Sequence, residues 1–81
     1  MFIIGDIGNT EIKIYLVNNK YIKIKKILLK TSLISYTYIN KKLKFLKNKK
    51  IRFALLSSGV PYAYKKLKFF LNINIKFLVQ N

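Results

Sequence analysis

The chain has 81 residues, enough for one small domain, and 52% of them are hydrophobic, which excludes a disordered composition. It carries 17 Lys and Arg against 2 Asp and Glu, a formal net charge of +15. The lack of Cys and His excludes disulfides, zinc ribbons, thiol chemistry and an imidazole base. Asp6 and Glu11 are the only side-chain carboxylates, which argues against a self-contained enzyme.

The first part of the chain predicts a three-stranded antiparallel meander. The expected strands are residues 2–7, 11–17 and 21–27. The first is a short apolar run, and the other two alternate apolar and polar side chains, a pattern typical of half-buried strands. In the third strand Ile22 and Ile24 alternate with lysines. Turns are expected at residues 8–10 and 18–20, where Gly and Asn suit tight hairpins.

The rest of the chain predicts two helices, each followed by a buried strand. Thr31 and Ser32 can cap a first helix, and Pro61 suits the first turn of a second. The helices are expected at residues 33–47 and 61–71, and the strands at 51–57 and 75–79. The apolar stripes of the helices are Tyr36, Ile39, Leu43 and Leu46, and Ala63, Leu67, Phe70 and Leu71.

This element order, β-β-β-α-β-α-β, predicts an α/β fold with a mixed five-stranded sheet and two helices. Strands that follow helices favour right-handed crossovers and parallel pairing onto the meander. No linker or repeat divides the chain, so residues 1–81 are expected to form one domain. That domain is expected to be incomplete, because no further element covers the second face of the sheet.

The positive charge has two interpretations. Sixteen of the 17 cations are Lys and only Arg52 is Arg, whereas surfaces that clamp phosphates or read bases favour Arg. Lys, Ile, Asn, Tyr and Phe have codons rich in A and T, so genomic drift at solvated positions accounts for the lysines. We therefore expect no specific nucleic-acid partner. The alternative is a small basic protein that binds RNA or an acidic surface without catalysis.

No membrane segment or leader is expected either. The longest apolar run, Phe53–Leu56, is far below the ~20 residues that a spanning helix needs. The N-terminus has no basic region, and Asp6 interrupts its apolar start. The expected location is the cytoplasm.

Asp6 to Lys13 is the segment where chemistry is expected. Gly8 lets the backbone approach a ligand closely, and successive N–H groups in such a turn can hold an anion. Lys13 offers a positive charge for a phosphate, and the Asp6 carboxylate can hold Mg²⁺ directly or through water. The alternative is a plain hairpin in which Lys13 lies in water.

The same segment resembles the first phosphate motif of the type III pantothenate kinases. The shared pattern is Asp-Ile-Gly-Asn-Thr-x-Ile-Lys directly after an apolar strand. A second stretch, residues 55–61 with the helix and strand that follow, resembles the family's Ser-Ser-Val-Val-Pro segment, although Gly59 replaces the commoner Val. These kinases belong to the acetate and sugar kinase, heat-shock chaperone and actin superfamily. The resemblance therefore implies the N-terminal half of an actin-like, ribonuclease H-like kinase fold.

The resemblance also implies the ligands. The residues expected to contact the ATP phosphates are Asp6, Ile7, Gly8, Asn9, Thr10, Glu11, Ile12 and Lys13. Asp6 is the expected Mg²⁺ ligand, and a monovalent cation (K⁺ or NH₄⁺) and a homodimer are family expectations. The reaction is phosphorylation of pantothenate to 4'-phosphopantothenate, the first step of coenzyme A biosynthesis.

The implied protein is truncated. The family's catalytic Asp, in a Gly-x-Asp-Arg segment, and its pantothenate site lie further along a longer chain, and no Asp or Glu follows Glu11 here. No catalytic residue is therefore expected in this chain. Pantothenate is expected as a partner only if the second half of the kinase is supplied. A third interpretation is an actin-like interaction module without chemistry.

Overall fold

The computed structural model describes residues 1–79. Its strands are β1 (Phe2–Ile7), β2 (Glu11–Val17), β3 (Lys23–Lys30) and β4 (Ala54–Ser58). Its helices are α1 (Tyr36–Leu43) and α2 (Pro61–Asn74), with short 3₁₀ helices η1 (Thr31–Leu33) and η2 (Lys44–Asn48) on either side of α1. The strand order is β3-β2-β1-β4, with β4 parallel to β1 and the other neighbours antiparallel. The α/β class, the mixed sheet and the two helices are thus confirmed.

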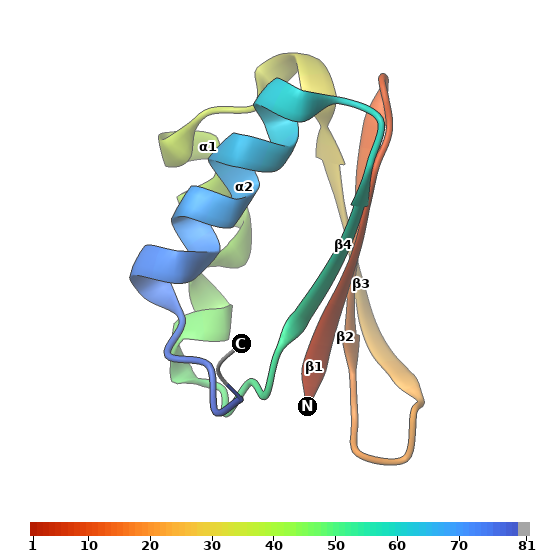
Figure 1. Cartoon of the computed structure of the whole chain (residues 1–81), viewed down its shortest axis with the longest axis vertical. Helices are drawn as coiled ribbons and strands as arrows, with labels where there is room; N and C mark the ends of the chain where they lie inside the picture. Colours follow the sequence, from red (N-terminus) through yellow and green to blue (C-terminus); the bar gives the residue numbers. More distant parts are fainter. Residues whose placement is uncertain (80–81) are drawn as a thin grey trace.

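Both α-helices pack on one face of the sheet (Figure 1). On β2 the alternating residues Ile12, Ile14 and Leu16 lie in the core beneath them, each at most 3% exposed. The whole predicted stripe of α2 is buried: Ala63, Leu67, Phe70 and Leu71. Of the stripe predicted around α1, Ile39, Leu43 and Leu46 are buried, but Tyr36 is 44% exposed. The sequence periodicity therefore identified the buried faces of both helices with one exception.

The other face of the sheet carries no helix within residues 1–79 (Figure 1). The strand registers define two rows across it, in the order β3-β2-β1-β4: Leu28, Lys13, Asp6 and Ser57, and Lys26, Tyr15, Ile4 and Leu55. Leu28 is 47% exposed and Leu55 is 57% exposed. We call this surface the open face. None of the helices in residues 1–79 has the length and apolar character needed to span a bilayer.

The third strand lies later in the chain than predicted, at 23–30 instead of 21–27. The side chain of Asn18 accepts hydrogen bonds from the backbone N–H groups of Lys20 and Ile22, so the loop extends further than a tight turn. Tyr21 in that loop has a φ of 64°. A register irregularity between Leu16 and Val17 follows. As a result Ile22 and Ile24 are exposed, and the chain places later residues of β3 over the core.

The first predicted helix, 33–47, is broken into three pieces. The residue that caps α1 is Ser35, and not Thr31 or Ser32. The Oγ of Ser35 accepts a 3.2 Å hydrogen bond from the N–H of Tyr38. Residues 31–33 form the separate turn η1, and the α-helix gives way to η2 after Leu43. Thr31 is hydrogen-bonded to Gly8 and Thr10 of the β1–β2 turn, and the α-helix begins five residues later, at Tyr36.

The predicted strand at 75–79 is wrong, so within residues 1–79 the sheet has four strands and not five. Helix α2 continues beyond its predicted end to Asn74, and the N–H of Ile75 still bonds to the carbonyl of Leu71. Leu78 and Val79 donate N–H bonds of 3.0 and 2.8 Å to the carbonyls of Ile51 and Arg52, which precede β4. Helix α2 thus ends directly before the predicted strand, and residues 75–79 form no strand.

Candidate functional site

The turn between β1 and β2 is tight and fixed by backbone contacts. The N–H of Gly8 donates a 3.0 Å hydrogen bond to the carbonyl of Glu11. A side chain at position 8 would crowd this contact, since a Cβ there would lie 3.1 Å from the Glu11 oxygen. The φ of Gly8 is not positive, so its backbone conformation does not call for glycine. The close approach to the Glu11 carbonyl is what favours glycine at this position.

Asp6 and Lys13 lie directly opposite one another on β1 and β2. Both belong to the open face, where Asp6 is exposed and Lys13 half-buried. Ser57 lies beside Asp6 on the neighbouring strand β4 and is also exposed. A carboxylate, an ammonium group and a hydroxyl thus share one row of the sheet, accessible to a ligand from the same side.

The remaining residues of the predicted phosphate segment divide into two groups. Asn9, Thr10 and Glu11 are exposed around the tip of the turn, and Glu11 lies opposite Lys30 of β3. Ile7 and Ile12 are at most 2% exposed in the core. The side chains of these two residues face the helices, so only their backbone groups could contact an anion.

Thr31 is a residue of this site that the sequence reasoning missed. Its Oγ1 donates a 2.7 Å hydrogen bond to the carbonyl of Gly8, and its N–H donates a 3.1 Å bond to the carbonyl of Thr10. Thr31 is fully buried, so both bonds are shielded from water. It therefore holds the shape of the β1–β2 turn from the far end of β3. In sequence it is indistinguishable from a helix cap, since both roles need a small hydroxyl residue after a strand.

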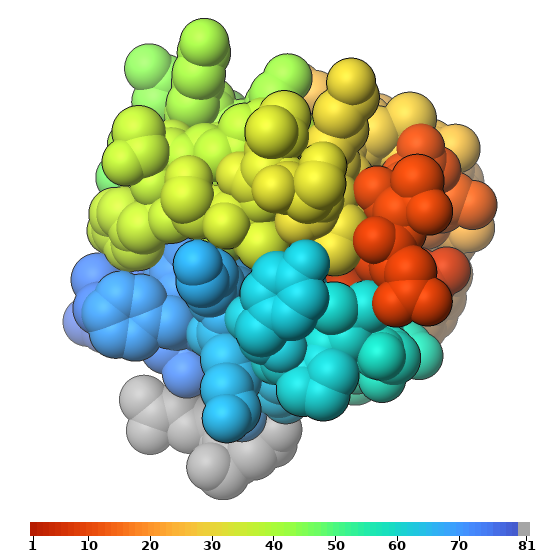
Figure 2. Space-filling model, turned by 90° about the horizontal axis from the view of Figure 1, so that it is seen from above, coloured from red at the N-terminus to blue at the C-terminus, as the bar shows by residue number. Residues whose placement is uncertain are grey.

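The second predicted segment meets the first at the same end of the sheet. β1 and β4 are parallel, so Ser57 and Ser58 pair with Asp6 and Ile7 at their carboxyl ends. The N–H of Gly59 bonds to the carbonyl of Ile7 at 3.3 Å. Seen onto this end, the β1–β2 turn (red and orange) lies next to the β4–α2 connection (cyan) and the segment after β3 (yellow) (Figure 2). In open α/β sheets, ligands bind at the carboxyl ends of strands.

The start of α2 completes this end of the molecule. Pro61 occupies the first turn of the helix, where its missing N–H has no cost. Just before it, Ser58 Oγ accepts a 2.9 Å hydrogen bond from the N–H of Val60. The predicted loop and helix start are confirmed.

A metal held by protein alone does not fit this site. Residues 1–79 contain no group of three Asp, Glu, His or Cys side chains that could surround an ion. One exposed carboxylate does fit a Mg²⁺ ion that keeps several waters and is bound mainly by substrate phosphates. Asp6 meets that requirement, so the donor set suits a metal delivered with a nucleotide.

The chain is similar in part to a known kinase. Over 43 residues it is 56% identical to the type III pantothenate kinase of Pelagibacter ubique (strain HTCC1062). The matched stretch is 53% of this chain but only 17% of that protein. No protein-family model matches the chain, and no solved structure matches it. The match supports a partial homology to type III pantothenate kinase.

Proposed function

We propose that the end of the sheet around Asp6 and Lys13 binds the phosphates of Mg²⁺–ATP, as part of a type III pantothenate kinase-like protein. One observation carries this proposal: Asp6 and Lys13 lie opposite each other on the open face, at the carboxyl ends of the parallel strands. The partial identity to a protein of that name supplies the reaction class.

Each polar group has a role that its chemistry supports. The Lys13 ammonium neutralises phosphate charge, and the exposed turn at Asn9 and Thr10 offers backbone and side-chain donors. Asp6 binds the Mg²⁺, directly or through a water. The bound ion would supply positive charge that offsets the charge of the phosphates. The buried hydrogen bonds of Thr31 keep the turn preformed, so little ordering is needed when the nucleotide binds.

The complete reaction needs more than these residues. The proposed activity is transfer of the ATP γ-phosphoryl group to pantothenate, an entry step to coenzyme A. That transfer needs the acceptor hydroxyl held in line, with a carboxylate near it. Asp6 and Glu11, the only side-chain carboxylates, lie at the two sides of the phosphate turn. We therefore propose that residues 1–81 alone bind nucleotide without phosphorylating pantothenate.

Binding of Mg²⁺–ATP, followed by amide chemical shifts, tests the first part of the proposal. Lys13→Met should weaken the affinity about tenfold, because a charge-assisted contact is lost. Lys26→Met is the matched control, since Lys26 is an exposed lysine on the open face in the next row. Equal weakening by both substitutions would mean that general positive charge binds the nucleotide, and would overturn the assignment.

Turnover tests the second part. The isolated chain, given ATP, Mg²⁺, a monovalent cation and pantothenate, should form no ADP or phosphopantothenate. When the chain is joined to the remaining part of a type III pantothenate kinase, turnover should return and Asp6→Asn should abolish it. Normal turnover by the Asp6→Asn fusion would remove Asp6 from the mechanism.

A specific nucleic-acid function is not favoured by the distribution of the lysines. All of them are exposed except the half-buried Lys13, and they lie on both helices, the strands and the loops. Any binding to DNA or RNA should be indifferent to sequence and lost as salt rises past physiological strength. A sequence-selective complex that survives such salt would instead support the basic binding protein.

A further inference from the structure

Helix α2 carries a second set of residues at helical spacing, beside the set that it buries. Tyr62, Lys66, Phe69 and Ile73 follow one another at intervals of four, three and four residues. This spacing is typical of the seam along which two helices pack. The three apolar members are each more than half exposed, so the seam is accessible. We call these four residues the outer seam.

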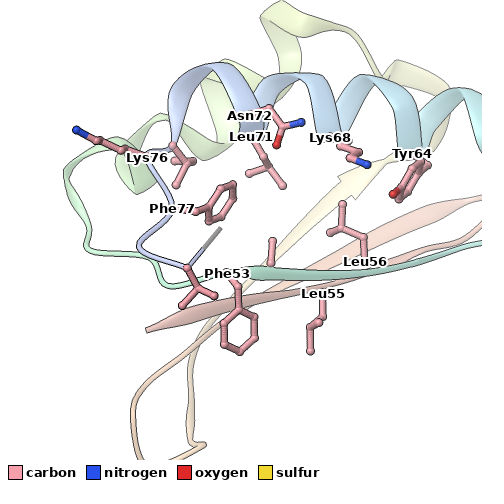
Figure 3. Close-up of a pocket in the computed structure, with 12 residues that line it drawn as sticks. Phe53, Leu55, Leu56, Tyr64, Lys68, Leu71, Asn72, Lys76 and Phe77 are labelled. Carbon is pink, nitrogen blue, oxygen red and sulfur yellow. The ribbon is translucent and has the colours of Figure 1, made fainter. Parts of the chain in front are cut away.

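The outer seam lies on the flank of α2 that borders α1. The ring of Phe69 meets the ring of Tyr36 in α1 edge to face, with their centroids 6.1 Å apart. The opposite flank of α2 faces β4, where Tyr64, Lys68 and Leu71 line a separate groove (Figure 3). No element in residues 1–79 lies beyond the helical layer (Figure 1). Within that part of the chain, no third helix packs on the outer seam.

A pocket of about 310 Å³ opens beside the seam. It is lined by Ser35 and Tyr36 at the start of α1 and by Lys65, Lys66 and Phe69 of α2. The lining is almost entirely apolar, so the two lysines contribute their methylene stems to it and keep their ammonium groups at the rim. Ligand pockets range from about 300 to 1,000 Å³, so this one has room for a single large side chain.

The aromatic wall of this pocket is held in place. The Tyr36 hydroxyl accepts a 3.0 Å hydrogen bond from Asn74 Nδ2, which also donates a 2.9 Å bond to the carbonyl of Phe70. The Tyr36 ring packs on the ring of Phe70 as well, at a centroid distance of 5.7 Å. Tyr36 is therefore fixed although it is exposed. A preformed pocket lowers the entropic cost of ordering when a partner binds.

The charges around the outer seam select the chemistry of the partner. Helix α2 contains three lysines and no acidic residue. A second copy of the chain would set lysine against lysine, with a net charge of +15 on each copy. Acidic side chains would instead be attracted. A lipid surface has neither a register to match nor a side chain to insert, so the spacing and the pocket favour a polypeptide helix.

We propose that the outer seam binds an acidic amphipathic helix of a partner protein, which lies along α2 over the start of α1. One large apolar side chain of that helix enters the pocket between Tyr36 and Phe69. Acidic residues that flank the apolar stripe of a helix border the same face, so their carboxylates meet Lys65 and Lys66 while the apolar side chain is inserted. This interaction uses no residue of the proposed phosphate site.

A helical peptide of three heptads, with Leu at positions a and d and Glu at e and g, tests the proposal. Added to the full ¹⁵N-labelled chain, it should shift the amide signals of the outer seam most, with a dissociation constant of about 100 μM or lower. Shifts centred on the open face, at Tyr15 and Leu28, would overturn the proposal. No binding at about millimolar peptide would also overturn it.

Two altered peptides test the charge and the conformation of the partner. A peptide with Lys in place of every Glu should bind about tenfold more weakly, because it meets Lys65 and Lys66. A peptide with Pro at its centre should also bind about tenfold more weakly or worse, because Pro breaks the helix. Equal binding of the acidic peptide and either altered peptide would overturn the proposal.

Two matched pairs of variants locate the interaction on the chain. Phe69→Ala should weaken the acidic peptide about tenfold, whereas Leu55→Ala should not, although both side chains are 57% exposed. Lys66→Glu should weaken it about tenfold, and Lys68→Glu by about twofold at most, because Lys68 lies on the flank toward β4. All four residues are exposed, so the variants should fold. Equal effects within either pair would overturn the proposal.

The same Phe69→Ala variant tests the other occupants of the seam. The positive charge of the chain alone attracts vesicles that contain phosphatidylserine, so Phe69→Ala should leave vesicle binding unchanged. Loss of vesicle binding in this variant would assign the seam to lipid and overturn the proposal. Sedimentation should show a monomer for the chain alone. A dimer that Phe69→Ala dissociates would assign the seam to a second copy and overturn the proposal.

Discussion

Leu28 and Leu29 are neighbours on β3, yet Leu28 is 47% exposed and Leu29 only 1%. They belong to the two faces of one sheet. The covered face holds the apolar contacts with both helices, and the open face holds the polar row that includes Asp6 and Lys13. The difference shows that the alternation of side chains along each strand separates the apolar core from the face on which the ligand site is proposed. Four predictions test this separation.

The largest expected effect is on the covered face. Leu29→Ala should lower the free energy of unfolding by about 2–5 kcal/mol, because it leaves a cavity in the core. Leu28→Ala removes the same atoms from the open face and should cost less than about 1 kcal/mol. Urea denaturation of both variants gives the comparison directly. Equal losses would show that the open face is covered in solution.

Thr31→Val comes next, since it changes a buried hydroxyl that links the covered core to the β1–β2 turn. The substitution preserves shape but leaves the Gly8 carbonyl without its donor, so we expect a loss of about 1–3 kcal/mol. Affinity for Mg²⁺–ATP should fall as well. Thermal unfolding and nucleotide titration measure the two effects, and unchanged values in both would remove Thr31 from the turn's support.

Ser35→Ala should cost about 1 kcal/mol, because Ser35 supplies the N-cap of α1. The control is Ser32→Ala, an exposed residue that the sequence pattern had favoured as a cap and that should change the stability by less than about 0.5 kcal/mol. Thermal denaturation ranks the two variants. The reverse ranking would place the start of the helix where the sequence had predicted it.

The smallest expected effect on stability is that of Asp6→Asn. Asp6 is exposed on the open face, so the free energy of unfolding should stay within about 0.5 kcal/mol of the unmodified chain. Chemical denaturation checks this, beside the binding assays proposed for the same residue. A large loss would mean that Asp6 is a structural residue and not part of a ligand site.

The elements that could be predicted from the sequence are those whose contacts are local or strongly periodic. β1, β2 and α2 begin where expected, and α2 buries its whole predicted stripe. The turn at Gly8 and the neighbouring positions of Asp6 and Lys13 follow from hairpin geometry alone. The position of Ser57 beside Asp6 was not predicted, because it depends on the register in which β4 pairs with β1.

The errors arise where a distant contact overrides a local pattern. The 21–30 segment has apolar residues in both registers, and the Asn18 side chain, which extends the loop, selects between them. The start of α1 is delayed because Thr31 bonds to the β1–β2 turn. The final strand is absent because residues 75–79 follow an irregular path after α2: the N–H of Ile75 bonds back to Leu71, and Leu78 and Val79 bond to residues that precede β4. Secondary-structure propensities, which are summed over a short stretch of sequence, carry no information about contacts between distant residues.

The two bonds of Thr31 also have a consequence for the order of folding. They join residues 23 and 21 positions apart in sequence, so the turn acquires its final shape only after β3 has docked on β2. Contacts between distant residues require closure of a loop before they stabilise anything, and they form late. A nascent chain that has released only the first hairpin would therefore contain every residue of the phosphate motif and still lack its geometry. The nucleotide affinity that we propose would therefore arise only together with the complete sheet.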